Sequence, residues 1–253
     1  MTTEYFRIVL WGWIALGLLL VPLQLRVTAP YGRHTRGDWG PMIDNRLGWI
    51  VMEIVSPLVF AYFFLSGNQP KTAPMWIIFA LWIAHYLHRS LIFPFRLQTR
   101  GKQMPLSIAA SAAFFNAVNG FFNGYYLGYL SPPYPLSWLS DPRYLLGLVL
   151  FLGGAAINLW ADNRLINLRR RSDEGGYRIP RGGLFRYVSC PNHFGEIVEW
   201  TGFAILCWNL PAFSFAVWTA ANLIPRACSH HRWYRTHFPD YPQDRRAVIP
   251  GLL

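Results

Sequence analysis

The feature that most constrains this 253-residue chain is the recurrence of apolar runs close to the thickness of a bilayer. A helix needs about 20 mostly apolar residues to cross the hydrocarbon core. Charged residues make up only 14% of the chain, against about 25% in soluble domains, which argues against a soluble enzyme. The sequence therefore predicts an all-α integral membrane protein with seven transmembrane helices. The predicted spans are Phe6–Gln24, Leu47–Ser66, Pro74–Pro94, Leu106–Leu127, Tyr144–Leu165, Phe194–Leu206 and Leu210–Ile224.

Lys and Arg are distributed unevenly between the segments that connect these spans. Of the 23 basic residues, 20 lie on one side, and Arg7, Lys71 and Arg143 lie on the other. Cytoplasmic loops carry the excess of basic residues, so we predict an amino terminus outside and a cytoplasmic carboxyl terminus. The net charge of +11 then indicates topology and contact with anionic lipid of the bilayer, not nucleic acid.

Several common features are missing from the sequence. The first apolar run has no small-residue cleavage site and is followed by basic residues, which predicts a retained helix. There is no internal repeat and no long linker, so we expect a single domain over residues 1–253. Cys190, Cys207 and Cys228 have no metal-binding or redox spacing and are interpreted as apolar filling.

Polar side chains inside the predicted spans are candidates for function because burying them in hydrocarbon is costly. At 1.5 Å per residue from the cytoplasmic helix ends, Glu53 lies about 9 Å deep and Tyr86 about 12 Å deep, so the two are nearly level. Further polar residues fall in the same cytoplasmic half, namely Asn158, Asp162, Glu196, Glu199 and Asn222. Together they predict a pocket between helices that opens to the cytoplasm.

The carboxyl group and the phenol suggest a specific chemistry. A buried Glu53 without a cationic partner keeps its proton, and beside the Tyr86 hydroxyl it can hold a carbonyl oxygen and stabilise the charge that develops there. The alternative is that Glu53 pairs with His85, His88 or Arg89 only to satisfy helix packing.

Three amides share one face of the fourth predicted span. Asn116, Asn119 and Asn123 stand at helical spacing on a helix that also contains Gly120 and Gly124. Small residues and amides together are typical of close helix packing, so we prefer packing to a ligand role for this face.

The segment Arg169–Arg186 combines clustered Arg with Gly pairs and a Pro, which indicates turns. Guanidinium groups and turn amides suit a diphosphate and a ribose phosphate, and lipid headgroups are the alternative ligands. No GxGxxG motif follows a strand and no strand is expected, so a Rossmann domain is excluded. We place His230, His231, His237 and Cys228 in an Arg-rich tail and favour phosphate contact over a metal site.

Longer motifs allow a comparison with a known family. The sequence closely resembles steroid 5α-reductases, and SCPNHFGEIVEW at 189–200 is most similar to their plant members. The carboxyl-terminal motifs are NLWAD at 158–162, LINLR at 165–169, GYRIPRGGLFRYVSCPNHFGEIVEW at 176–200, PRACSHHRWY at 225–234 and FPDYPQDRRAVIP at 238–250. The amino-terminal ones are APYGRHT at 29–35, MEIVSP at 52–57 and HYLHR at 85–89.

The resemblance implies an NADPH-dependent 3-oxo-5α-steroid 4-dehydrogenase that reduces the C4=C5 bond of 3-oxo-Δ4-steroids. Hydride transfer would be to C5, with Glu53 and Tyr86 polarising the C3 carbonyl. Residues 1–130 would mainly form the substrate pocket, and residues 144–253 would mainly bind NADPH. The family's cofactor contacts fall on Asn158, Asp162, Arg169, Tyr177, Arg178, Asn192, Glu196, Arg226, His230 and Tyr234.

The chain departs from the family pattern at two positions and leaves other readings open. Met52 stands where the family commonly has Gln, and Ser229 replaces the first of three His. The alternatives are an isoprenylcysteine-type methyltransferase using S-adenosylmethionine, a non-catalytic sterol-binding protein, and a reductase of enoyl thioesters or polyprenols. A short chain without a retention signal suits a bacterial inner membrane, whereas eukaryotic relatives sit in the endoplasmic reticulum. No obligatory protein partner is evident.

Overall fold

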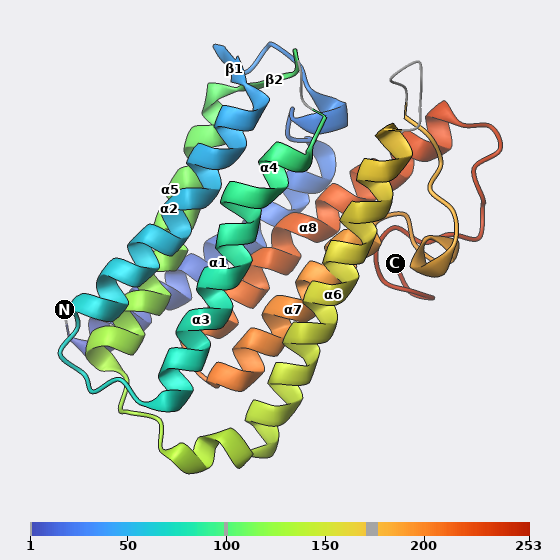
Figure 1. Ribbon diagram of the computed structural model, residues 1–253. Helices are drawn as coiled ribbons and strands as arrows, with labels where there is room; N and C mark the ends of the chain where they lie inside the picture. The colour runs from blue at the N-terminus through green and yellow to red at the C-terminus, as the bar shows by residue number, and fades with distance from the viewer. Residues whose placement is uncertain (1, 99–100, 171–176) are drawn as a thin grey trace. The chain divides into compact units, whose positions relative to one another are not determined.

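The computed structural model describes residues 2–98, 101–170 and 177–253, and most of them are helical (Figure 1). A π-helical turn, His88–Ile92, joins α3 to α4 without a break, and a second, Tyr126–Leu130, continues α5. Each predicted span therefore lies within one continuous helical segment. Arg100 and Arg171, two of the basic loop residues, lie outside the described residues. The helices are α1 Thr3–Arg26, α2 Asn45–Ser66, α3 Ala73–Leu87, α4 Phe93–Arg96, α5 Leu106–Tyr125, α6 Pro142–Arg170, α7 Pro191–Cys207 and α8 Leu210–His237.

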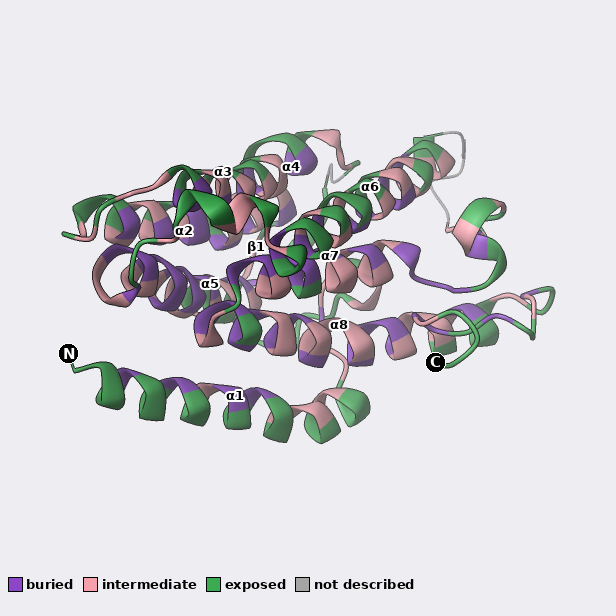
Figure 2. Ribbon diagram, turned by 90° about the horizontal axis from the view of Figure 1, so that it is seen from below, coloured by how far each residue is buried: buried purple, intermediate pink, exposed green. Residues whose placement is uncertain are grey.

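Four helical segments of the described chain are long and apolar enough to cross a membrane. They are Thr3–Arg26, Asn45–Ser66, Ala73–Arg96 and Pro142–Arg170. Along α1 large apolar side chains are exposed, with Leu19 at 75% and Leu23 at 55%, as expected for a surface that faces lipid (Figure 2). The structure thus supports a helical membrane protein, while seven spans and their orientation stay predictions.

The chain divides into two compact units. The first comprises Met1–Leu10, Ala29–Leu145 and Asn209–Ala212, and the second comprises Trp11–Thr28, Leu146–Trp208 and Phe213–Leu253. Glu53 and Tyr86 belong to the first unit, and all ten residues expected to bind the cofactor belong to the second. The expectation of a single domain is not tested by this division.

In the first unit α2 packs against both α5 and α3. A Cβ atom at Gly124 of α5 would lie 2.5 Å from the backbone oxygen of Phe60 in α2, so only glycine permits this approach. The close packing expected of the Asn and Gly face is therefore confirmed at this helix crossing. A Cβ atom at Gly120 would lie 2.9 Å from the backbone oxygen of Ser56, so the close contact extends to within one turn of Glu53.

A short antiparallel sheet also fixes the starts of α2 and α5. Strand β1, Met42–Asp44, pairs with β2, Gln103–Pro105. The expectation that the chain contains no strand was wrong, because two three-residue strands so far apart in sequence leave no periodic pattern. Asp44 also caps α2, since its carboxylate accepts hydrogen bonds from the backbone N–H groups of Arg46 and Leu47 at 2.9 and 3.0 Å.

In the second unit α8 is longer than the sequence indicated. It continues through Pro225 to His237, whereas the predicted span ends at Ile224. His230, His231 and His237 of the Arg-rich tail therefore lie on a helix, beyond the end of the predicted span. A proline within a helix removes only one backbone donor and bends the helix, so it does not have to end it.

Helices α6 and α7 of the second unit meet at glycine. A Cβ atom at Gly154 would lie 2.3 Å from the backbone nitrogen of Glu199 and 2.5 Å from the oxygen of Gly195. A Cβ atom added to the neighbouring Gly153 would meet no other part of the protein within 4 Å. Of these two glycines, only Gly154 is needed for the close contact between the backbones of α6 and α7.

We expect Gly154→Ala to lower the melting temperature of the protein in detergent, whereas Gly153→Ala leaves it unchanged or raises it slightly. The added methyl group forces α6 and α7 apart, and overpacking of this kind costs about 1–3 kcal/mol. That corresponds to a decrease of roughly 2–12 °C for a chain of this length. Equal melting temperatures for the two variants, measured by thermal unfolding, would contradict the close backbone contact.

Candidate functional site

Glu53 lies in α2 beside a cation from the π-helical turn. Its Oε1 atom is 3.7 Å from Nη2 of Arg89, and the two side chains are 13% and 11% exposed. The Arg89 guanidinium also lies over the rings of Trp49, at 5.1 Å, and Phe93, at 4.5 Å. The structure thus shows the alternative that the sequence left open, a cationic partner for Glu53, because the turn after Tyr86 brings Arg89 alongside it.

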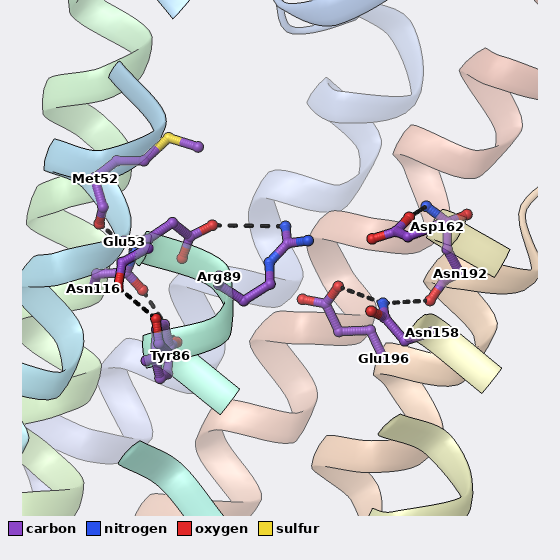
Figure 3. Close-up of polar contacts among 10 residues, drawn as sticks. Met52, Glu53, Tyr86, Arg89, Asn116, Asn158, Asp162, Asn192 and Glu196 are labelled. Carbon is purple, nitrogen blue, oxygen red and sulfur yellow. Dashed lines mark hydrogen bonds and ion pairs between the residues drawn. The ribbon is translucent and has the colours of Figure 1, made fainter. Parts of the chain in front are cut away.

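Tyr86 is buried in α3 and is tied to α2 through a single amide. Its hydroxyl donates to Oδ1 of Asn116 at 3.2 Å, and Nδ2 of Asn116 donates to the backbone oxygen of Met52 at 2.6 Å (Figure 3). Because Met52 directly precedes Glu53, the amide joins the phenol to the chain segment that carries the carboxyl group. No spacing in the sequence indicates these two bonds of Asn116.

The other two amides of this face bond as packing residues do. Nδ2 of Asn119 donates to the backbone oxygen of Phe115, and Nδ2 of Asn123 donates to the backbone oxygens of Asn119 and of Pro211 in α8. Helical spacing placed the three amides on one face but did not distinguish the one that faces Tyr86.

In the second unit α6 and α7 bring together four residues that we expect to bind the cofactor. Nδ2 of Asn158 donates to Oε2 of Glu196 at 3.2 Å and to the backbone oxygen of Asn192 at 3.0 Å. Nδ2 of Asn192 in turn donates to Oδ1 of Asp162 at 3.2 Å (Figure 3). Asn158 and Asp162 are a helical turn apart, so one face of α6 presents an amide and a carboxylate to the first turn of α7.

Other expected cofactor residues form a group of aromatic and basic side chains. The Arg169 guanidinium lies over the Tyr177 ring at 5.0 Å, and the Tyr177 ring meets that of Trp233 at 5.0 Å. Trp233, which the sequence did not single out, thus belongs to this group. Arg178 is exposed on the segment that follows.

The remaining three expected cofactor residues lie along α8. Arg226 is buried, the His230 ring lies 5.5 Å from that of His193, and Tyr234 stacks on Tyr241 at 5.2 Å. Among the described ranges 2–98, 101–170 and 177–253, no group of three or more His, Cys, Asp or Glu has the arrangement of a metal site.

The carboxyl-terminal segment is bonded to the start of α7 and to α8. The backbone N–H of Ser189 donates to the backbone oxygen of Arg246 at 2.8 Å, and that of Cys190 donates to the backbone oxygen of Ala247 at 3.1 Å. The Ser189 hydroxyl also lies 2.7 Å from Nδ1 of His231 and 2.6 Å from the Tyr241 hydroxyl. Through Ser189, His231 therefore connects α8 to the carboxyl-terminal segment. His231 directly follows His230, one of the residues expected to bind the cofactor.

This connection is expected to weaken in acid. Burial, followed by the charges of Arg235, Arg245 and Arg246, lowers the pKa of His231 below its ordinary value. In the unfolded segment His231 takes up a proton near pH 6.5, so its contribution to stability is present above that pH and is lost as the pH falls toward the lowered folded-state pKa.

We therefore predict that the amides of Ser189 and Cys190 exchange faster at pH 5.5 than at pH 7.5, after correction for intrinsic rates. Hydrogen exchange with mass spectrometry measures this protection. The pH dependence should decrease in His231→Gln and persist in His237→Gln, because His237 is exposed and bonds only to residues of its own helix turn in the contacts described. Equal pH dependence in both variants would show that His231 does not control the segment.

Comparison with known proteins identifies the family. Residues 102–253 match the family model of 3-oxo-5-alpha-steroid 4-dehydrogenases. The chain is 42% identical over 232 residues to a steroid 5-alpha-reductase DET2 of Gossypium hirsutum, covering 88% of each chain. It is 40% identical over 241 residues to a 3-oxo-5-alpha-steroid 4-dehydrogenase 1 of Macaca fascicularis, covering 94% of this chain and 90% of the relative. It is 36% identical over 252 residues to a DET2 protein of Arabidopsis thaliana, covering 97% and 96%.

The similarity extends over nearly the whole chain and includes both units. It favours a reductase over the methyltransferase and the non-catalytic sterol-binding protein. The three relatives named are eukaryotic, so they lend no support to a bacterial origin. With 36–42% identity to these proteins and a family match over most of its length, the chain belongs to the steroid 5-alpha-reductase family of oxidoreductases.

Proposed function

We propose that this protein reduces the C4=C5 double bond of 3-oxo-Δ4-steroids to 5α-3-oxosteroids, with NADPH as the reductant. The observation that carries the proposal is the arrangement around Asn116, which bonds to Tyr86 and to the residue before Glu53. It brings two potential hydrogen-bond donors to one part of the first unit, in a chain whose relatives are named for this reaction.

Glu53 and Tyr86 would act on the C3 carbonyl oxygen. In this role Glu53 has to carry a proton when the steroid binds, because an ionised carboxylate can only accept hydrogen bonds. Hydrogen bonds from that acid and from the phenol draw electrons toward the C3 oxygen, which makes C5 electrophilic through the conjugated double bond. As C5 is reduced, negative charge develops on the oxygen, and the same two donors stabilise it. The proton that completes the reaction is then added at C4.

Arg89 adds a positive charge to this arrangement. Its 3.7 Å distance from Glu53 exceeds the roughly 2.7–2.9 Å of a charge-assisted hydrogen bond. We therefore interpret Arg89 as a nearby charge that stabilises the developing oxyanion, and its contacts with Trp49 and Phe93 keep the guanidinium in place.

The residues of the second unit have the chemistry that NADPH requires. Arg169, Arg178 and Arg226 offer guanidinium groups for phosphates, including the 2′-phosphate. Asp162, Glu196 and the amides bonded to them offer acceptors and donors for ribose hydroxyls and the carboxamide. Tyr177 and Trp233 present aromatic faces on which a base can stack. When bound, NADPH supplies the hydride.

The proposed activity is tested by incubating the purified protein in detergent with NADPH and either testosterone or progesterone. Mass spectrometry should detect a product two mass units heavier, and comparison with standards should identify the 5α-3-oxosteroid. NADPH labelled with deuterium at the transferred position should place the label at C5. If both steroids are recovered unchanged while an enoyl thioester or a polyprenol is reduced, the substrate class is wrong.

We also propose that the protein works as an integral membrane protein in contact with the bilayer. The steroid partitions into lipid, and the four apolar helical segments support this location. The bacterial inner membrane and the endoplasmic reticulum stay as the two predicted compartments. Membrane fractionation of the source cells distinguishes them.

A further inference from the structure

Asn116 connects the helix that carries Tyr86 to the segment that carries Glu53. It is 5% exposed and lies on α5, yet both of its described hydrogen bonds are made to other helices. One goes to the Tyr86 hydroxyl of α3 and the other to the Met52 carbonyl of α2. The described bond of Asn119, by contrast, is to the backbone oxygen of Phe115 in its own helix.

The chemistry of Asn116 and its two partners, Tyr86 and Met52, determines which group donates in each hydrogen bond. The Met52 carbonyl can only accept, so the NH₂ group of Asn116 has to face it. The amide oxygen then faces Tyr86, and because this oxygen cannot donate, the phenol does. The hydrogen of the Tyr86 hydroxyl is thus directed at Asn116 in this arrangement.

We propose that Asn116 is a positioning residue that sets the place of the Tyr86 hydroxyl relative to the Glu53 segment. This inference rests on the proposed function of Tyr86. A carbonyl oxygen that binds there competes with Asn116 for the phenolic hydrogen, while the amide holds the phenol oxygen close to its working position. The close contacts of α5 with α2, Gly120 with Ser56 and Gly124 with Phe60, keep Asn116 itself in register with Met52.

The next two amides on this face of α5, Asn119 and Asn123, make no described bond to Tyr86 or Met52. Asn119 and Asn123 make their described bonds to backbone oxygens of Phe115, Asn119 and Pro211. Asn119 is as buried as Asn116, at 1% exposed, so it provides a matched control for loss of a buried amide on α5.

A double-mutant cycle with steroid turnover as the readout tests the inference. We expect Asn116→Leu to lower kcat about tenfold with little rise in KM, because the phenol loses its position and not its binding surface. In the Tyr86→Phe background the same substitution should change kcat less than twofold, since no hydroxyl remains to be positioned. Asn119→Leu should have the same effect on kcat in both backgrounds.

Thermal unfolding of each variant in detergent shows which proteins are folded. If Asn116→Leu does not fold, Asn116→Asp replaces it, because a carboxyl oxygen still accepts from Tyr86 while the donor to Met52 is lost. Equal effects of either Asn116 substitution in the two backgrounds overturn the inference and leave the proposed function intact. Unchanged turnover in Tyr86→Phe overturns it together with the role of Tyr86, and failure to reduce any 3-oxo-Δ4-steroid overturns the proposed function itself.

Discussion

Glu53→Gln and Tyr86→Phe are each expected to lower steroid turnover at least tenfold, which corresponds to about 1.4 kcal/mol of lost transition-state stabilisation. Gln keeps the shape of Glu53 but donates from a much weaker acid, and Phe removes the phenolic donor altogether. Both changes weaken the hydrogen bonds that strengthen as charge develops on the C3 oxygen. The measurement is kcat with saturating NADPH.

The same variants should retain NADPH binding, because the residues proposed to hold the cofactor belong to the other unit. Fluorescence titration with NADPH gives this control, and thermal unfolding shows that each variant is folded. A folded, NADPH-binding variant with wild-type turnover would show that its residue does not polarise the carbonyl. Asn119→Leu again provides a comparison for general damage to the first unit.

Arg169→Ala, Arg178→Ala and Arg226→Ala are each expected to weaken NADPH binding about tenfold or more. A charge-assisted hydrogen bond to a phosphate contributes about 1.5–3 kcal/mol, and tenfold in Kd corresponds to about 1.4 kcal/mol. The wild-type protein should prefer NADPH to NADH, because Arg forks bind a 2′-phosphate well. At least one of the three variants should lose part of this preference.

Arg181→Ala is the matched control for the cofactor variants. Arg181 lies close to Arg178 in sequence, but its Nη2 pairs with Oδ2 of Asp240 at 3.2 Å, and the two side chains are 65% and 68% exposed. Exposed pairs of this kind contribute little to stability. Equal loss of NADPH affinity in Arg181→Ala and the three test variants would indicate a general charge effect. Binding of S-adenosylmethionine with none of NADPH would contradict the proposed cofactor.

The sequence by itself determined the class of protein. Apolar runs of bilayer length have a local cause, because a backbone in hydrocarbon has to satisfy its hydrogen bonds within its own helix. The positions of Glu53 and Tyr86 along their helices follow from a fixed rise per residue. The motifs between Asn158 and Pro250 indicated the family for the same reason, since they can be compared without knowing how the helices pack.

Tertiary structure decided the partners of these residues. The Arg89 guanidinium reaches Glu53 because a π-helical turn follows Tyr86, and a widened helical turn has no simple signature in the spacing of apolar residues. Asn116 and Asn119 are equivalent in sequence pattern, and only the packing of α5 against α2 and α3 distinguishes them.

The pairing of the two strands and the bonds of the carboxyl-terminal segment could likewise be seen only in the tertiary structure. Met42–Asp44 pairs with Gln103–Pro105, and Ser189 bonds to Arg246 and His231, across separations of more than 40 residues. Hydrogen bonds over such distances depend on where the helices place each segment. Periodicity and spacing describe one segment at a time, so they predict the helices and the residue types of the site but not the bonds that join them.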